Sequence, residues 1–181
     1  INTTYPDFNP YPNHHSDQHD ILFLPSNNNV MLNAADGGLY KTTDCMSSNV
    51  TWTSLNTSYI TSQFYTVAVD HNTPGDKKII GGAQDNGSWW ENSDDPTNTW
   101  TFSAKGDGSF CSIQQNGGMY YFSRQLGEII KCTLDATGHA TAFRRIDPIG
   151  AKGYDFINPF VIDPNDDKIM YLPAGTKVWR N

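Results

Sequence analysis

The chain has 181 residues, of which 17% are charged and 13% aromatic, and its net charge of −7 gives a pI near 4.9. This acidic balance argues against nucleic acid as a partner, because phosphate binding requires clustered Lys and Arg. No apolar run approaches the ~20 residues of a membrane helix, so no transmembrane segment is expected. The mixture of aromatic and β-branched residues with Gly, Asn and Asp predicts an all-β fold of short strands and many turns.

Strand-like runs recur along the chain in four similar sets. The first set comprises 20–25, 30–33, 37–41 and 51–55, and the second comprises 66–71, 78–82, 87–90 and 99–102. The third comprises 110–115, 119–122, 129–132 and 141–146, and the fourth comprises 159–164, 168–172 and 177–180. Each complete set has the size and strand number of one structural repeat.

The spacing of these sets favours a β-propeller. The ends of the four first runs, at Pro25, His71, Gln115 and Pro164, lie 46, 44 and 49 residues apart. A period of roughly 40–50 residues with four short strands is typical of one propeller blade. The sequence therefore predicts antiparallel blades at approximately 14–56, 62–103, 106–147 and 155–181, of which the last is incomplete.

The loops between third and fourth strands share a pattern of the form Ser/Thr-x-Asp followed by Thr-Trp. The matching residues are Thr42, Asp44 and Trp52 in the first set, Ser93, Asp95, Thr99 and Trp100 in the second, and Asp135 in a degenerate third copy. In such a loop the aspartate is expected to accept hydrogen bonds from turn N–H groups, while the tryptophan packs the next strand.

Three such loops at blade spacing resemble the BNR/Asp-box repeat. The segments 15–20, 36–41, 63–70, 81–88, 106–108 and 158–164 are also similar to secreted bacterial glycosyl hydrolase-like proteins, in a superfamily that includes sialidases, xyloglucanases and sortilin-type receptors. The resemblance implies about four blades of a seven-bladed propeller and a secreted or cell-surface location. It also implies that the remaining blades, or another subunit, complete the ring.

In a four-stranded blade, the segment that leads into the first strand and the loop between strands two and three lie at the same end. We therefore expect 15–20, 36–38, 84–87 and 106–108 to share one rim. Candidate substrate-binding residues on it are His15, His19, Asp36, Gln84 and Asn86.

Paired carboxylates on this rim are candidates for glycoside hydrolysis, which uses two of them as acid and base or nucleophile. The candidate catalytic residues are Asp17 with Asp85 or Asp107, with His19 in a positioning role. The alternative is structural, because Asp-Gly and Asp-Asn-Gly sequences form tight turns in which the aspartate caps its own backbone.

The pattern His15-x-Asp17-x-His19 would point three side chains the same way on an extended strand. That arrangement suits a metal ion, an anionic substrate or a hydrogen-bonded channel lining. Clustered aspartates also allow Ca²⁺, although the D-x-D-x-D spacing is lacking. No metal ligands are assigned from the sequence, and no other cofactor is expected.

The cysteines show no zinc-binding spacing. Cys45, Cys111 and Cys132 are an odd number, so at least one is unpaired within the chain. Two alternatives remain open for the others, a Cys111–Cys132 disulfide and buried thiols.

The favoured function is a carbohydrate- or protein-binding or structural role outside the cell, with a glycan or cell-surface protein as partner. The alternative is a glycoside hydrolase that uses the paired rim aspartates. A sialidase is disfavoured, because none of Arg124, Arg144, Arg145 and Arg180 lies in a rim segment. Neither end carries a targeting segment, and both ends are expected to continue in a longer protein.

Overall fold

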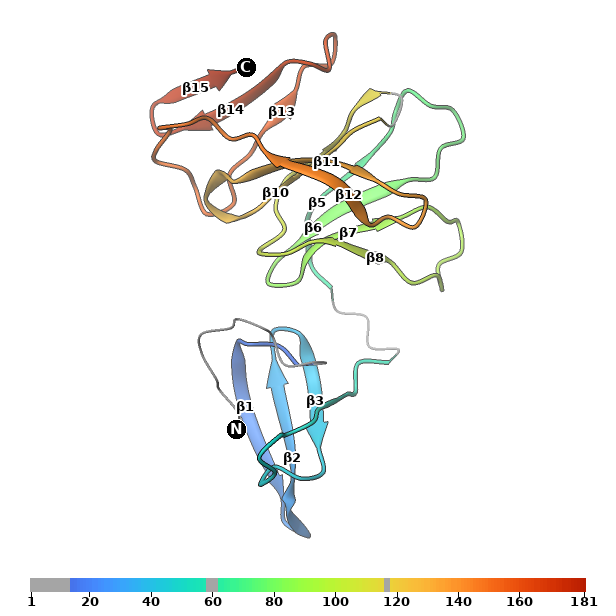
Figure 1. The fold of residues 1–181 in the computed structure, drawn as a ribbon, viewed down its shortest axis with the longest axis vertical. Helices are drawn as coiled ribbons and strands as arrows, with labels where there is room; N and C mark the ends of the chain where they lie inside the picture. The colour runs from blue at the N-terminus through green and yellow to red at the C-terminus, as the bar shows by residue number, and fades with distance from the viewer. Residues whose placement is uncertain (1–13, 58–61, 116–117) are drawn as a thin grey trace. The chain divides into compact units, whose positions relative to one another are not determined.

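The computed structural model of the protein describes residues 14–57, 62–115 and 118–181. These residues form four antiparallel β-sheets with almost no helix, which confirms the predicted all-β class (Figure 1). The chain divides into two compact units, Ile1–Thr61 and Ser62–Asn181. The first unit holds one sheet and the second holds three.

Within each sheet the strands are neighbours in chain order. The first sheet contains β1 (Gln18–Leu24), β2 (Asn27–Ala35), β3 (Gly38–Thr42) and β4 (Thr53–Ser54). The second contains β5 (Phe64–Val69), β6 (Ile79–Ala83), β7 (Gly87–Glu91) and β8 (Thr101–Ala104). The third contains β9 (Cys111–Ile113), β10 (Tyr120–Ser123), β11 (Ile129–Leu134) and β12 (Ala140–Arg145), with the 3-10 segment η2 (Gln125–Gly127) between β10 and β11. The fourth contains β13 (Val161–Ile162), β14 (Met170–Ala174) and β15 (Lys177–Arg180).

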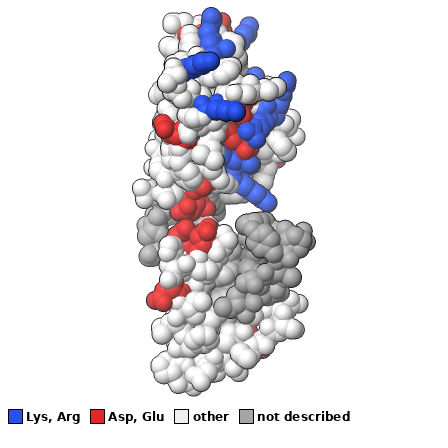
Figure 2. Space-filling view, turned by 90° about the vertical axis from the view of Figure 1, so that its left-hand side faces the viewer, with Lys and Arg blue, Asp and Glu red and all other residues white. Residues whose placement is uncertain are grey.

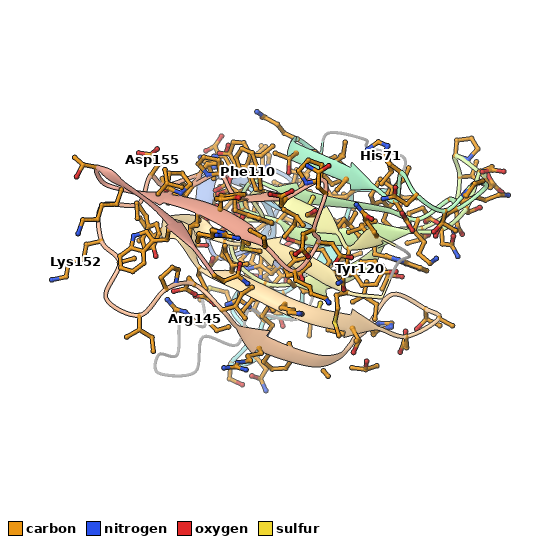
Figure 3. All side chains as sticks on the ribbon, turned by 90° about the horizontal axis from the view of Figure 1, so that it is seen from above. His71, Phe110, Tyr120, Arg145, Lys152 and Asp155 are labelled. Atoms are coloured by element: carbon orange, nitrogen blue, oxygen red, sulfur yellow. The ribbon has the colours of Figure 1, made fainter. Side chains whose placement is uncertain are left out.

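The strand β10 of the third sheet is buried on both faces. Tyr120 and Phe122 of β10 pack in one cluster with Ile80 and Trp90 of the second sheet. The intervening Tyr121 joins a separate cluster with residues of the fourth sheet. Because successive strand side chains point to opposite faces, the run Tyr-Tyr-Phe supplies both cores at once. The sheets of this unit are therefore stacked face to face, and Figure 3 shows side chains crowded between them, where Tyr120 is labelled.

The second and third sheets also contact each other directly through main-chain atoms at two glycines. A Cβ atom on Gly82 of β6 would lie 2.1 Å from the carbonyl oxygen of Ser109. A Cβ atom on Gly108 would lie 2.0 Å from the carbonyl oxygen of Gly87. Glycine within a strand often marks such a close approach of two backbones.

The three cysteines are free thiols, so the Cys111–Cys132 disulfide considered from the sequence does not form. The two residues lie on β9 and β11, which are separated by β10. Two strand spacings of about 4.8 Å each exceed the span of a disulfide. Burial raises the pKa of each of these two thiols to about 11, which keeps them protonated at neutral pH.

Charged side chains of the second unit form local ion pairs. Lys77 contacts Asp94 at 2.5 Å, and Arg145 contacts Asp147 at 2.7 Å. The visible face in Figure 2 accordingly shows basic groups in separate patches, with acidic groups among them. Among the described residues, no helix has the length and apolar character needed to cross a membrane.

Candidate functional site

The first unit gathers three candidate residues at the β2–β3 turn. One donor atom each from His15, Asp17 and Asp36 lies within 4.8 Å of the others. The Asp36 N–H donates to the Asp17 carbonyl oxygen at 3.1 Å, which ties the turn to the segment that leads into β1. The Asp17 N–H donates to His15 Nδ1 at 3.2 Å, so this ring nitrogen presents a lone pair.

His19 joins the same group through a contact between its Nε2 atom and Asp36 Oδ1. It lies at an irregularity in the β1–β2 register, where Gln18 pairs with Ala35 and Asp20 pairs with Ala34. Such a bulge re-aims the side chain of the extra residue. The expected alternation of His15, Asp17 and His19 along one extended strand was wrong, because β1 begins only at Gln18 and a bend precedes it.

Glycine at position 37 allows His15 to lie directly against the turn. A Cβ atom on Gly37 would lie 2.8 Å from the Cβ of His15 and 2.5 Å from the hydroxyl oxygen of Tyr40. That hydroxyl donates to the Gly37 carbonyl oxygen at 2.9 Å. The turn is therefore held from both sides, which fixes the position of the neighbouring His15.

His14 is a further residue at this end of the first sheet. Its ring stacks on Trp52 with centroids 4.4 Å apart, and its Nε2 atom contacts the side-chain nitrogen of Asn33. A neutral imidazole can accept the amide N–H at this nitrogen. Burial lowers the pKa of His14, and the nearby His15 adds to the shift against an opposing hydrogen bond from Gln18.

We expect His14 to make the first unit less stable in acid. The unfolded chain protonates near the ordinary histidine pKa of 6.5, whereas the folded unit protonates only at lower pH. Stability is therefore greatest above that pH and falls as the pH drops through 6.5 towards the lowered value. His14→Phe keeps the stack on Trp52, so its urea midpoint should fall less between pH 7.5 and 5.5 than that of the parent chain. His71→Phe, at an exposed position, should keep the parental pH dependence, and an equal drop in His14→Phe would refute the assignment.

The second unit brings together Asp85 and Asp107. The Asp85 N–H donates to Asp107 Oδ1 at 3.0 Å, and the Asp107 N–H donates to Gln125 Oε1 at 3.0 Å. Asp85 has a φ of 59°, a conformation that few non-glycine residues adopt, and the Asp107 bond supports the turn that requires it. Asp107 thus caps the β6–β7 turn from the segment that leads into β9. Gln125 belongs to no sequence motif, so nothing in the sequence indicated that its side chain would hold Asp107.

Gln84 and Asn86 are also engaged in this turn. The Gln84 N–H donates to the Gln63 carbonyl oxygen at 3.3 Å. The Asn86 side chain donates to the Gln84 carbonyl oxygen at 3.0 Å, and Trp89 Nε1 donates to the Asn86 carbonyl oxygen at 2.7 Å. These bonds hold the backbone of the turn, in which Asn86 is half-buried and Gln84 is exposed.

The loops between third and fourth strands contain local aspartate turns. Asp44 Oδ1 accepts from the Met46 N–H at 3.3 Å, and Asp95 Oδ1 accepts from the Thr97 N–H at 2.9 Å. Asp135 Oδ1 accepts from the Thr137 N–H at 2.8 Å. Hydrogen bonds from the Thr97 and Thr137 side chains, with their N–H groups, lower the pKa of Asp95 and Asp135. All three carboxylates therefore have a structural use in these loops.

The other residues of these loops pack or cap around the aspartates. Thr42 is buried, and its hydroxyl accepts from the Asp44 N–H at 3.3 Å. Ser93 Oγ accepts from the Asp95 N–H at 3.0 Å. Trp52 is buried in the core of the first sheet, and Trp100 lies 5.3 Å from Phe64 between ring centroids. Thr99 lies in the exposed segment before β8.

These positions separate two kinds of chemistry. The first unit presents imidazole and carboxylate groups that converge on one point. In the second unit, the candidate catalytic Asp107 supports a neighbouring turn. A catalytic pair of Asp17 with Asp85 or Asp107 would join residues of two units and stays a prediction. No protein-family model matches the chain, and comparison with curated proteins finds no match.

Proposed function

We propose that this chain is a run of Asp-box β-propeller blades from a secreted or cell-surface protein, which binds a glycan or a protein without hydrolysing it. The four consecutive antiparallel sheets, each a simple up-and-down meander, are compatible with blades. The face-to-face stacking of the second, third and fourth sheets supports the same architecture.

A repeated backbone frame supports the blade assignment further. In the first sheet the Asp36 N–H donates to the Asp17 carbonyl oxygen, and in the second the Gln84 N–H donates to the Gln63 carbonyl oxygen. A register shift follows two residues later in both sheets, at His19 and at Tyr65. The same bond and the same bulge at the same place in both sheets support a shared repeat.

The contact between successive sheets also recurs within the second unit. The segment before β9 caps the turn of the second sheet through Asp107. The segment before β13 meets the third sheet at the corresponding turn, but through main chain, since the Leu126 N–H donates to the Phe156 carbonyl oxygen at 2.9 Å. Radial repetition of one inter-sheet contact is the principle of a propeller.

The observation that favours binding over hydrolysis is the use of Asp107 as a cap. A glycosidase requires two carboxylates that face the scissile bond, with one free to give its proton. Asp107 instead accepts a backbone hydrogen bond from Asp85, the other candidate partner of Asp17. A turn-closed edge of this kind suits recognition through exposed groups such as Gln84, and secretion and the nature of the ligand remain parts of the proposal.

Substitution of Asp107 separates the two functions. Asp107→Ala removes the acceptor for the Asp85 N–H and should cost about 1–3 kcal/mol in the free energy of unfolding, measured with urea. Asp107→Asn retains an acceptor oxygen and should cost less. A binding protein should keep its glycan-array or protein-binding profile in Asp107→Asn and show no glycosidase turnover in either form.

Hydrolysis by the parent chain would contradict this proposal if Asp107→Asn or Asp85→Asn abolished it while near-ultraviolet circular dichroism stayed unchanged. The assay should use the full natural protein, so that any additional blades are present. Exposed Asp94→Asn serves as the matched control, since Asp94 contacts Lys77 and lies outside the candidate rim.

A further inference from the structure

The side chains of the His15, Asp17, His19 and Asp36 cluster are not required by the backbone frame that holds them. The second sheet builds the same frame with Gln63 in place of Asp17, Tyr65 in place of His19 and Gln84 in place of Asp36. The turn-to-strand hydrogen bond uses only main-chain atoms in both sheets. The main-chain frame itself therefore does not require the imidazole and carboxylate groups of the first sheet.

We propose that His15, Asp17, His19 and Asp36 form a binding site for one divalent transition-metal ion, of which Zn²⁺ is the best match. Two imidazoles and two carboxylates give a mixed nitrogen and oxygen ligand set, which suits four-coordinate zinc. Calcium takes oxygen ligands alone, so the two histidines select against it. The inference is independent of whether the surrounding face binds a glycan or protein.

Three of the four ligands require only a small adjustment to bind an ion, whereas His19 lies outside this close group and has to move further. Donor atoms around tetrahedral zinc lie about 3.4 Å apart, given bonds of about 2.1 Å. The atoms of His15, Asp17 and Asp36 already lie within 4.8 Å of one another. The Asp17 side chain is 65% exposed and the His19 side chain 63% exposed, so these two are able to move inward. His15 and Asp36 are largely covered and provide the fixed half of the site.

Protonation and charge also favour a cation. His15 Nδ1 accepts the Asp17 N–H, so it already carries the lone pair that a metal requires. When His15 Nδ1 turns to the ion, a water molecule can accept the Asp17 N–H instead, because the bend is exposed. Residues 1–61 contain one lysine, no arginine and five aspartates, a net charge of −4 with neutral histidines. The visible face of this unit in Figure 2 accordingly carries acidic but few basic side chains.

Zinc titration of the full chain tests the site. After treatment with a chelator and its removal, calorimetry with ZnCl₂ should show one saturable equivalent. Asp17→Asn and His19→Ala change exposed side chains and should weaken zinc binding about 100-fold or more without unfolding the chain. Gly37→Ala should also weaken it, because the added methyl group displaces His15. His71→Ala and Asp94→Asn, both exposed and in the second unit, should bind zinc as the parent chain does.

Cobalt and calcium identify the ligands and the metal class. The Co²⁺ complex should lack thiolate charge-transfer bands, and a moderate excess of Ca²⁺ should not displace Zn²⁺. The proposal is overturned by the absence of a saturable equivalent, by unchanged affinity in Asp17→Asn and His19→Ala, or by thiolate bands from Cys45. Displacement by an equal concentration of Ca²⁺ would likewise overturn the assignment to a transition metal.

Discussion

Replacement of Gly82 by alanine is expected to destabilise the second unit by about 3 kcal/mol. The added Cβ would meet the Ser109 carbonyl oxygen at 2.1 Å and the Ser109 nitrogen at 2.5 Å. Both are backbone atoms of the adjoining segment, so no side-chain rotation relieves the overlap. Separation of the two segments would also strain the packing around the neighbouring Asp107 cap.

Urea unfolding of Gly82→Ala against Gly118→Ala measures this effect. Gly118 is exposed, and the nearest atom to a Cβ there would be 4.0 Å away. The control should therefore unfold close to the parent chain. Gly108→Ala should resemble Gly82→Ala, since its Cβ would lie 2.0 Å from the Gly87 carbonyl oxygen. If Gly82→Ala and Gly118→Ala have equal stability, the close packing of the second and third sheets is wrong.

Replacement of Phe122 by alanine is expected to cost about 3–5 kcal/mol in the free energy of unfolding. Phe122 is fully buried and belongs to the cluster that joins the second and third sheets. The truncation removes apolar contact and leaves a cavity that the surrounding strands fill only partly. Because the cavity lies between two sheets, the substitution should weaken the packing of the second sheet on the third as well as the packing of β10 itself.

Phe143→Ala is the matched control for this second prediction. Phe143 lies on β12 of the same sheet but is 75% exposed, so its removal should change stability by about 0.5 kcal/mol or less. The difference between the two phenylalanines should appear in urea midpoints followed by near-ultraviolet circular dichroism. Equal losses in both variants would show that β10 is not the buried strand of this sheet.

The inter-sheet contacts give Asp107 and Gly82 a common role at one boundary. Gly82 allows the segment after Asp107 to approach, and Asp107 then caps the Asp85 turn. The first sheet has the same turn-to-strand bond but carries histidines and aspartates around it. This contrast between the first and second sheets is what separates a structural aspartate from a candidate ligand.

The local elements of the fold were predictable from the sequence. Alternating and continuous apolar runs placed the strands, since a run such as Tyr120 to Phe122 needs no distant residue to favour extended backbone. The structure has a strand at every strand-like run that the sequence indicated, although three of the strands are shorter than predicted: β4 (Thr53–Ser54), β9 (Cys111–Ile113) and β13 (Val161–Ile162). The aspartate turns at Asp44, Asp95 and Asp135 were equally predictable from the sequence, because each carboxylate and its N–H donors lie within four residues of one another.

The partners of the rim residues depended on tertiary structure. Asp85 and Asp107 are 22 residues apart in the chain. Only the packing of one sheet on the next brings Asp107 into position to cap the turn at Asp85. His19 reaches Asp36 because β1 bulges against β2, a feature that no spacing rule indicated. The sequence by itself determined the strands, their turns and the residue types of the rim. Tertiary structure decided which of those residues support a neighbour and which converge on a possible ligand, because these contacts join groups distant in the chain.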